Sequence, residues 1–531
     1  MKKILIPVLS LLMAAFAVSC TEQEPDYSGM RAVLGIEVAD MQDLYQVNKR
    51  QQKTVNLKVT AEEISGTTLN VIIGVNPDLV ATYNEAHGTD YVMLPAEAYS
   101  FVDREVMLPR FNKISSLGVL NLIGKGCESE KTYLLPVVIE KVDGSENFEL
   151  SETSVAYFVF KINVPVGGDG SPEDPYLIKE LNDLVTINEK MLSGDISYFS
   201  LQNDIDMSSV TDWVRINSSP YNAKIHFEGN GHKITNYKGT TGLFHVLYGT
   251  FQNVVFENCS VEAAGANTGL LADYLGYIKD ENTYPAHVKN VTFKDCKYKS
   301  GGNDCGLLCA YAYSSLAENV YMENCECTFT ARRHGFLAGR IEGGTAEFKN
   351  CYVKGGKVIK GTQQVGGLVG QNNDAILIVS NCGYSAEFEG TNRNMAAILA
   401  YAKKDDKLGG DGTTTITNCL VWTPNMTCAT NTGDLYSSGV VVGCSEQTVV
   451  TYKNCLRKSD LVFKEYMEGM NDLVDNADVE NTAVVSGSVG THNFPYHGKA
   501  AAAGATASQA AKQLGWDEAI WDLSDAEPKL K

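Results

Sequence analysis

The sequence has little positive charge for its size and only one long apolar run. Its 531 residues include 44 Lys and Arg against 64 Asp and Glu, a formal net charge of −20. This shortage argues against a nucleic-acid-binding protein, because phosphate contacts need clustered Lys and Arg. Apolar residues approach membrane-spanning length only near the N-terminus, at residues 4–18. A multispanning membrane protein is therefore excluded.

Several enzyme and metal signatures are missing as well. The sequence has no Gly-x-x-x-x-Gly-Lys-Ser/Thr loop, no Gly-x-Ser-x-Gly turn and no His-Glu-x-x-His motif. It has 14 cysteines but no Cys-x-x-Cys pair, the commonest spacing of zinc ligands. What it has is 44% apolar residues, 48 Gly and a length that suits two or three domains. We predict a folded, turn-rich β-protein with no metal and no cofactor.

The first twenty residues follow the pattern of an export signal. Lys2 and Lys3 precede the apolar segment, and small residues lead up to Cys20. Residues 17–20, Ala-Val-Ser-Cys, resemble the lipobox of bacterial lipoproteins, with Ala17 in place of the commoner Leu. The acidic residues that follow resemble the export signal of Bacteroidota surface lipoproteins. The resemblance implies a signal peptide over 1–19, a lipidated Cys20, a tether over 20–31, and an outer-membrane location exposed at the cell surface. Ordinary secretion is the alternative.

Residues 32–163 alternate apolar and polar residues in short stretches rich in Val and Ile, which predicts the strands of a β-sandwich. One helical interruption is expected at residues 77–87, with Pro77 at the first helical position. Residues 76–78, 88–91 and 133–136 resemble an all-β domain of unknown function that follows the lipid anchor in many Bacteroidota surface lipoproteins. The resemblance implies a spacer or docking module. A Gly-rich linker is expected over 164–175.

Residues 176–456 contain a repeat. Seven Asn-Cys or Asp-Cys dipeptides end short apolar stretches, with their cysteines at positions 259, 296, 325, 351, 382, 419 and 455. The intervals are 37, 29, 26, 31, 37 and 36 residues, and most repeats contain a second, Gly-led apolar element. Two short strands per repeat predict a parallel β-helix, and the crossover rule favours a right-handed coil. A β-propeller is the alternative, but its blades have a tighter period. Residues 457–531 are expected to form a C-terminal cap, with Trp516 and Trp521 sealing the last coil.

The start of this region, at residues 170–178, 199–206 and 227–234, resembles the first coils of secreted β-helix proteins with Gly-Leu-rich repeats. The resemblance supports the fold and implies little about function, since these proteins are mostly uncharacterised or described as adhesion-like. Stacked strands lie about 4.8 Å apart, so the seven cysteines are expected to form one internal ladder of free, buried thiols. A zinc site is the alternative.

Candidate ligand-binding residues follow the Gly-led elements. Counted from the glycine, equivalent positions are occupied by Tyr274, Tyr311, Arg340 and Asn372. Aromatic and planar polar side chains stacked at coil spacing would form a platform for sugar rings. Repeat insertions often collect on the binding face, which adds the loops 383–396 and 420–438 with Tyr384, Arg393, Trp422 and Tyr436. Ordinary packing is the alternative for each residue.

Residues 331–361 reverse the sign of the overall charge, with seven Lys and Arg against Glu342 and Glu347. A basic patch for carboxylated or sulfated glycans is one interpretation, and solvated outward strand positions are the other. The patch residues are Arg332, Arg333, Arg340, Lys354 and Lys357.

Acidic residues give weak support for catalysis. Asp204 and Asp206 match the pattern of the first coils, so structure explains them. Asp405, Asp406 and Asp411 alternate with lysines and form no calcium-loop pattern. We therefore predict no catalytic residues and expect a surface lipoprotein that binds complex carbohydrate within a polysaccharide-utilisation system, with an outer-membrane uptake complex as partner. A β-helix lyase or glycoside hydrolase is one alternative, and an adhesin or structural surface protein is another.

Overall fold

The structure is a computed structural model that divides into two compact units, Met1–Pro165 and Val166–Lys531. It describes residues 26–27, 29–39, 41–47, 52–128, 131–162, 167–191, 196–218, 223–263, 265–279, 281–392, 394–404, 412–428, 438–465, 473, 475–484 and 496–531. The signal peptide, Cys20, Arg393, Tyr436 and the three aspartates of the loop 405–411 lie outside these residues. Within the described ranges, no helix is both long and apolar enough to cross a membrane.

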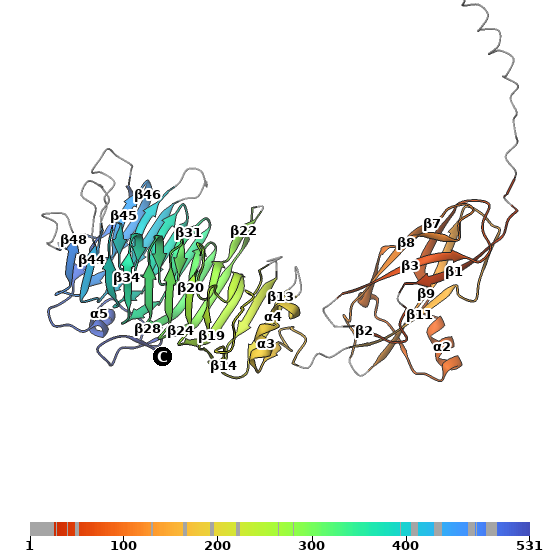
Figure 1. Ribbon diagram of the computed structural model, residues 1–531, viewed down its shortest axis with the longest axis horizontal. Coiled ribbons are helices and arrows are strands. Elements are labelled where there is room, and N and C mark those ends of the chain that lie inside the picture. The colour runs from red at the N-terminus through yellow and green to blue at the C-terminus, as the bar shows by residue number, and fades with distance from the viewer. Residues whose placement is uncertain are drawn as a thin grey trace, which may run out of the picture. The chain divides into compact units, whose positions relative to one another are not determined.

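The N-terminal unit is a two-sheet sandwich, shown at the red end of the colour scale in Figure 1. One sheet has the order β10-β1-β3-β8-β6 and the other β2-β11-β9-β4-β7, and the apolar faces of both contribute to one core. The first sheet comprises β10 (Phe148–Leu150), β1 (Ala32–Val38), β3 (Lys53–Ala61), β8 (Ile114–Leu122) and β6 (Tyr99–Asp103). The second comprises β2 (Tyr45–Val47), β11 (Val155–Ile162), β9 (Thr132–Asp143), β4 (Leu69–Val75) and β7 (Glu105–Leu108).

The helix expected in this unit is α2 (Leu79–His87). It ends at Gly88, whose φ of 65° lies in the left-handed region that terminates many helices. Tyr83 on α2 packs against Tyr157 of the sheet, with ring centroids 4.7 Å apart. This contact fixes the helix on the sandwich.

The second unit is a parallel β-helix, in which each coil contributes strands to several sheets (Figure 1). One coil consists of β24 (Ala286–Lys294), β25 (Lys297–Ser300), β26 (Cys305–Gly306) and β27 (Cys309–Ala312), and β28 (Ser315–Glu323) begins the next coil. β24 pairs in parallel with β28 over the full length of both strands. The prediction of an all-β chain with a C-terminal parallel β-helix is thus confirmed, while the hand of the coil stays a prediction.

Four sheets run along this unit, and their strands pair in parallel except for an antiparallel strand near the end of the largest sheet. The largest has 18 strands, from β12 (Tyr176–Ile178) to β50 (Lys499–Ala500), and continues past Leu456, the expected last residue of the repeat. An eight-stranded sheet runs from β17 (Lys238–Gly239) to β48 (Val462–Glu465). A four-stranded sheet runs from β26 to β40 (Met395–Ala396). The seven-stranded sheet comprises β18 (Phe244–Leu247), β21 (Ala272–Leu275), β27, β31 (Ala338–Glu342), β36 (Val369–Asn373), β41 (Leu399–Lys403) and β45 (Val442–Glu446).

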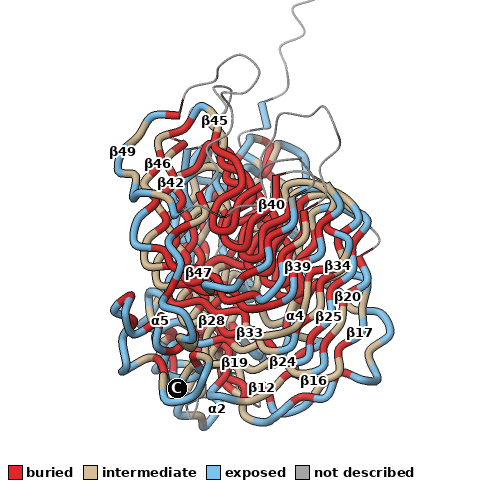
Figure 2. The backbone as a smooth tube through the Cα atoms, turned by 90° about the vertical axis from the view of Figure 1, so that its left-hand side faces the viewer, coloured by how far each residue is buried: buried red, intermediate tan, exposed pale blue. Residues whose placement is uncertain are grey.

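The interior of the coils is a continuous apolar column, seen as the red tube in Figure 2. Equivalent side chains stack directly, as in Phe227 on Phe251 and Phe256 on Phe293, both at 4.9 Å between ring centroids. Because each coil covers the apolar face of its neighbour, removal of this surface from water favours the stack.

In seven successive coils, one corner is an asparagine in the left-handed conformation. These residues have φ between 51° and 58° and are Asn253, Asn290, Asn319, Asn350, Asn381, Asn418 and Asn454. Other side chains pay a steric penalty there, whereas Asn tolerates it through local hydrogen bonds. The sequence therefore turns the chain at this corner without glycine.

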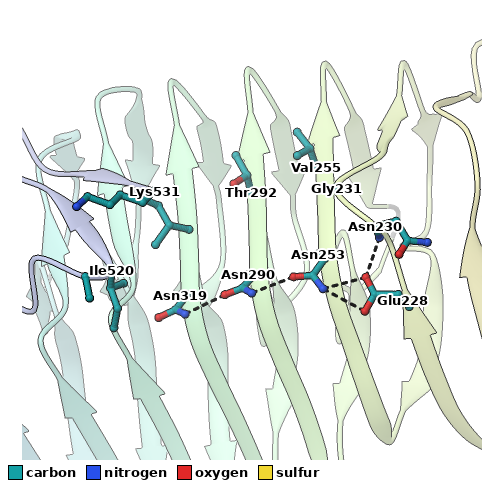
Figure 3. Close-up of a pocket in the computed structure, with 12 residues that line it drawn as sticks. Glu228, Asn230, Gly231, Asn253, Val255, Asn290, Thr292, Asn319, Ile520 and Lys531 are labelled. Atoms are coloured by element: carbon teal, nitrogen blue, oxygen red, sulfur yellow. Dashed lines mark hydrogen bonds between the residues drawn. The ribbon is translucent and has the colours of Figure 1, made fainter.

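The seven asparagines also bond to one another and form the asparagine ladder. Each Nδ2 donates to the Oδ1 of the preceding rung, and Asn253 donates to the carboxylate of Glu228. Donor–acceptor distances lie between 2.7 and 3.4 Å. Figure 3 shows the rungs Asn319, Asn290 and Asn253 leading to Glu228. All the amides therefore point the same way, and a carboxylate accepts the last bond.

The expectation of one cysteine ladder is wrong, because the cysteines occupy two corners. Cys259, Cys296 and Cys325 stack at one corner. Cys351 instead stands in register with Val320 of the preceding coil, next to the asparagine corner, and begins a second ladder there. Gly356 stands level with Cys325. The second ladder continues through Cys382, Cys419 and Cys455. The interval of 26 residues between Cys325 and Cys351 is thus a change of corner and not a short coil.

All thirteen described cysteines are buried and none forms a disulfide with another, which confirms the prediction of thiols for this part of the chain. Thiols of both ladders donate to backbone oxygens of the preceding coil, for example Cys325 Sγ to Phe293 O at 3.5 Å and Cys382 Sγ to Phe348 O at 3.4 Å. Burial raises the pKa of the Cys444 thiol to about 12 and that of Cys127 to about 11. The reactive thiolate is therefore scarce at neutral pH.

The C-terminal segment lies along the side of the β-helix, whereas the sequence predicted a seal over the last coil. Thr506 is the N-cap of helix α5 (Ala507–Gln513) and forms a reciprocal capping box with Gln509. Trp516 then donates from Nε1 to Asn418 O at 2.9 Å, and Trp516 and Trp521 meet the ring of Tyr352 edge-on. This segment therefore covers an outer face of the 18-stranded sheet.

Substitution of a ladder residue tests the corner. We expect Asn319→Gly to lower the free energy of unfolding by about 1–2 kcal/mol through the loss of two side-chain hydrogen bonds. Asn319→Ala should cost about 1 kcal/mol more, because Ala is strained at positive φ. Urea denaturation measures both. Asn425, an exposed strand residue outside the left-handed set, is the control, and there Ala should be at least as stable as Gly. If Asn319→Ala were also at least as stable as Asn319→Gly, the left-handed corner would not be what selects asparagine at this position.

Thiol titration tests the two cysteine ladders. Without reductant, the denatured protein should react at each of the thirteen described cysteines, because no disulfide links them. The native protein should react slowly at every one, since each is buried. Alkylation followed by mass spectrometry counts the modified residues. A shortfall of two in the denatured sample would reveal a disulfide and overturn the assignment.

Candidate functional site

A cleft lined by aromatic side chains opens on the seven-stranded sheet. Its volume is about 330 Å³. We call it the aromatic cleft, and its lining residues are His245, Val246, Tyr274, Tyr277, Ile278, Lys279 and Tyr313. Apolar and aromatic walls with a few polar groups are typical of small-molecule binding sites.

One wall of the cleft is a hairpin inserted into a single coil. Strands β22 (Tyr277–Lys279) and β23 (Asn282–Tyr284) pair antiparallel, with Tyr277 opposite Tyr284. Those two rings stack at 4.2 Å with an interplanar angle of 1°, and Tyr248 meets both edge-on. The insertion explains why 37 residues separate Cys259 from Cys296 where the next interval is 29.

The hairpin extends along the solenoid. Gly343 lies in the turn after β31, and a Cβ atom added to it would lie 3.2 Å from Cδ1 of Ile278. Gly343 and Gly344 have φ of 65° and 62°, so both the space and the backbone favour glycine there. Ile278 therefore rests on this turn and holds the hairpin beside the sheet.

Stacked tyrosines form the floor. Tyr274 stacks on Tyr311 of the next coil at 5.4 Å between centroids, and Tyr313 lies 6.3 Å from Tyr274 and 6.0 Å from Tyr311. Burial raises the pKa of Tyr313 to about 12 and also raises that of Tyr274. The hydroxyl groups therefore stay neutral at physiological pH and can both donate and accept hydrogen bonds.

A buried carboxylate fixes the back wall. His245 Nδ1 lies 2.9 Å from Oδ2 of Asp273, which is fully buried and also pairs with Arg215. The ring of His245 meets Tyr274 edge-on at 5.3 Å. Since Asp273 is held from two sides, His245 and Tyr274 keep a fixed orientation in the cleft.

Three of the predicted ligand residues lie in one row, as the spacing indicated. Tyr274, Tyr311 and Arg340 occupy the same register position in successive coils. Tyr274 lines the cleft, whereas Tyr311 is only 8% exposed beneath it. The guanidinium of Arg340 lies 5.9 Å from the Tyr311 ring and pairs with Glu342 at 3.0 Å. The cleft thus uses the first residue of the row, and the other two support it.

The prediction for Asn372 is wrong by one position. The residue that stands in strand register with Arg340 is Gln371. The count was one residue too far because the glycine equivalent to Gly335 is Gly366 and not Gly367. Asn372 is fully buried, and its Nδ2 donates to Ala375 O at 3.0 Å and to Thr414 Oγ1 at 2.9 Å. Its role is to hold a turn together inside the stack.

The prediction for Trp422 is also wrong, since this residue does not reach the cleft. Trp422 is 8% exposed and belongs to the apolar cluster of Trp516 and Trp521 on the 18-stranded sheet. Tyr384, from the other long loop, is fully buried in the core. These aromatics stabilise the fold.

The predicted basic patch does not form, because its residues lie in different sheets and four of the five pair with acids, three of which belong to the adjacent coil. Arg332 and Arg333 lie in the four-stranded sheet, Arg340 in the seven-stranded, Lys354 in the 18-stranded and Lys357 in the eight-stranded sheet. The ion pairs are Arg333 with Asp304, Arg340 with Glu342, Lys354 with Glu323 and Lys357 with Glu326. Acids of the adjacent coil, together with Glu342 of the same strand as Arg340, therefore neutralise most of this local charge.

The acids of the first coils have structural partners. Asp204 accepts from the backbone N–H of Lys233 at 2.9 Å, and this bond is the main cause that lowers its pKa. Asp206 caps the turn at Ser208 in the same way. Among the described residues, no group of three or more His, Cys, Asp or Glu side chains is placed to hold a metal ion.

A second cleft, of about 630 Å³, lies between the asparagine ladder and the C-terminal segment. Figure 3 shows Asn253, Asn290 and Asn319 on one side and Ile520 and Lys531 on the other. Its amides already bond to one another, and its lining has no aromatic ring. The aromatic cleft is therefore the better candidate for ligand binding.

The residues missed by sequence reasoning are His245, Tyr277, Ile278, Lys279 and Tyr313. The lengthened interval between Cys259 and Cys296 was the available signal, because it marks an insertion next to Tyr274.

Comparisons with known proteins cover both units. A family model described as "-like, N-terminal domain" matches residues 38–146, within the sandwich. No curated protein matches the sequence.

Several solved structures from Bacteroides species are similar. A putative immunoglobulin A1 protease from Bacteroides ovatus shares 23% identity with a TM-score of 0.44, over 68% of this chain and 94% of that one. A putative carbohydrate binding protein from Bacteroides ovatus shares 22% identity with a TM-score of 0.21, over 24% and 36%. Bacteroides thetaiotamicron EndoBT-3987 with Man5GlcNAc product shares 17% identity with a TM-score of 0.21, over 38% and 52%.

Proposed function

We propose that this protein binds complex carbohydrate in the aromatic cleft. The observation that carries the proposal is the set of three tyrosines, Tyr274, Tyr277 and Tyr313, that line one cleft together with few other polar groups. Sugar rings present C–H groups on their faces and hydroxyls at their edges. Tyrosine matches both, because its ring packs on the apolar face while its hydroxyl exchanges hydrogen bonds.

Binding fits the cleft better than hydrolysis does. Glycoside hydrolases use two carboxyl groups, one as acid and one as base or nucleophile. The seven lining residues include no Asp or Glu. The nearest buried carboxylate, Asp273, is engaged by His245 and Arg215.

We place the protein on the outer membrane as a lipoprotein exposed at the cell surface. What supports this location is the lipobox-like sequence ending at Cys20 and the acidic residues behind it. In this arrangement the sandwich is a spacer, and the β-helix presents the cleft to polysaccharide for an uptake complex in the same membrane.

Tyrosine substitutions test the binding site. Tyr274→Ala and Tyr313→Ala should each weaken the affinity for the bound polysaccharide about tenfold, because each removes a stacking surface. Tyr274→Phe keeps the ring and should retain most of the affinity. Affinity electrophoresis against plant, host and microbial polysaccharides measures the change.

The matched control is Tyr198→Ala. Tyr198 is also a partly buried tyrosine stacked on a neighbouring ring, His226, but it belongs to the 18-stranded sheet. This variant should bind like the unmodified protein. Equal binding by all four variants, or no binding of any polysaccharide by the unmodified protein, would refute the proposal.

Substitution of Cys20 tests the anchor. Cys20→Ser should move the protein from the membrane fraction to the soluble fraction and abolish incorporation of labelled fatty acid, because stable anchoring needs acyl chains on this residue. Fractionation of the cells, with the buried Cys127→Ser as control, measures the effect. Unchanged membrane association of Cys20→Ser would show that the anchor lies elsewhere.

A further inference from the structure

The aromatic cleft contains one charged residue that sequence reasoning missed, the cation Lys279. It lies on the hairpin strand β22, is exposed and lines the cleft beside Tyr277 and Ile278. Among the described residues, no ion pair joins Lys279 to an acid. The cations of the expected basic patch differ, because four of its five residues pair with acids.

Most other charged groups near the cleft lie in ion pairs. Asp273 behind the wall pairs with Arg215, Glu342 beyond the floor with Arg340, and Asp304 with Arg333. At the tip of the hairpin, Glu281 is not among the lining residues, and Asp280 lies outside the described residues. Among the described residues that line the cleft, Lys279 is therefore the one that carries a full charge.

An acidic glycan explains this combination better than a neutral one. Three tyrosines provide stacking surface for the sugar ring, and their neutral hydroxyls can donate to an anionic oxygen. An ammonium group at the rim adds a charge-assisted bond, which a neutral sugar could not use.

Resting on the function proposed above, we infer that the ligand carries acidic groups, carboxylate or sulfate, and that Lys279 binds them while Tyr274 and Tyr313 hold the sugar ring.

Matched pairs of polymers test the inference on the full chain. The probes are polygalacturonate against its carboxyl-reduced form, and dextran sulfate against dextran, so that each pair differs only in charge. One acidic member should bind at least about fivefold tighter than its neutral partner, and the preference should weaken as salt rises. A preference for polygalacturonate would indicate a carboxylate ligand, and a preference for dextran sulfate would indicate a sulfate ligand.

Variants assign the preference to the cleft. Lys279→Gln should lower affinity for the acidic polymer about fivefold and leave the neutral one unchanged. Lys238→Gln, on the eight-stranded sheet, is the matched control and should have no effect. Circular dichroism confirms that the variants are folded.

The possible failures are distinct. If acidic and neutral polymers bind equally and Lys279→Gln changes neither, while Tyr274→Ala weakens both, the inference is wrong and carbohydrate binding stands. If Lys238→Gln and Lys279→Gln weaken binding equally, the charge preference belongs to the whole surface and the inference is also wrong. If no polymer binds, here or among the wider polysaccharides, both proposals fail.

Discussion

The structure of the β-helix depends on one repeated corner, an asparagine that turns the chain in the left-handed conformation and bonds to the asparagine of the next coil. Glycine would satisfy the backbone and lose the bond, and most other residues would be strained. Seven such corners bonded head to tail, ending on Glu228, hold successive coils in register. The apolar column inside can stack only if this register is kept.

Register at the corner determines register everywhere else in the coil. Because equivalent residues of paired strands lie about 4.8 Å apart, Tyr274 on β21 and Tyr311 on β27 stack on each other. The solenoid also tolerates insertions, since a loop can leave a coil without disturbing its neighbours. The hairpin at β22 and β23 is such an insertion, and the cleft exists only where it stands beside the tyrosine row.

Much of this could be predicted from sequence, and the errors have physical causes. Strand alternation and the Asn-Cys repeat predicted the sandwich and the parallel β-helix. The single cysteine ladder was wrong because two different corners share one dipeptide. Asn372 was misplaced because Gly366 and Gly367 are adjacent and only the hydrogen-bond register distinguishes them. The basic patch failed because its residues lie in different sheets and three of the four acids that pair with them come from the adjacent coil. Lys279 was overlooked because a single lysine on an insertion follows no repeat.

A crystal structure with an acidic oligosaccharide would test the central claim most directly. The account predicts a sugar ring packed against Tyr274 and Tyr313, with a carboxylate or sulfate oxygen within hydrogen-bond distance of Lys279 Nζ. A sugar bound along the asparagine ladder, or on any other face with the aromatic cleft empty, would contradict it.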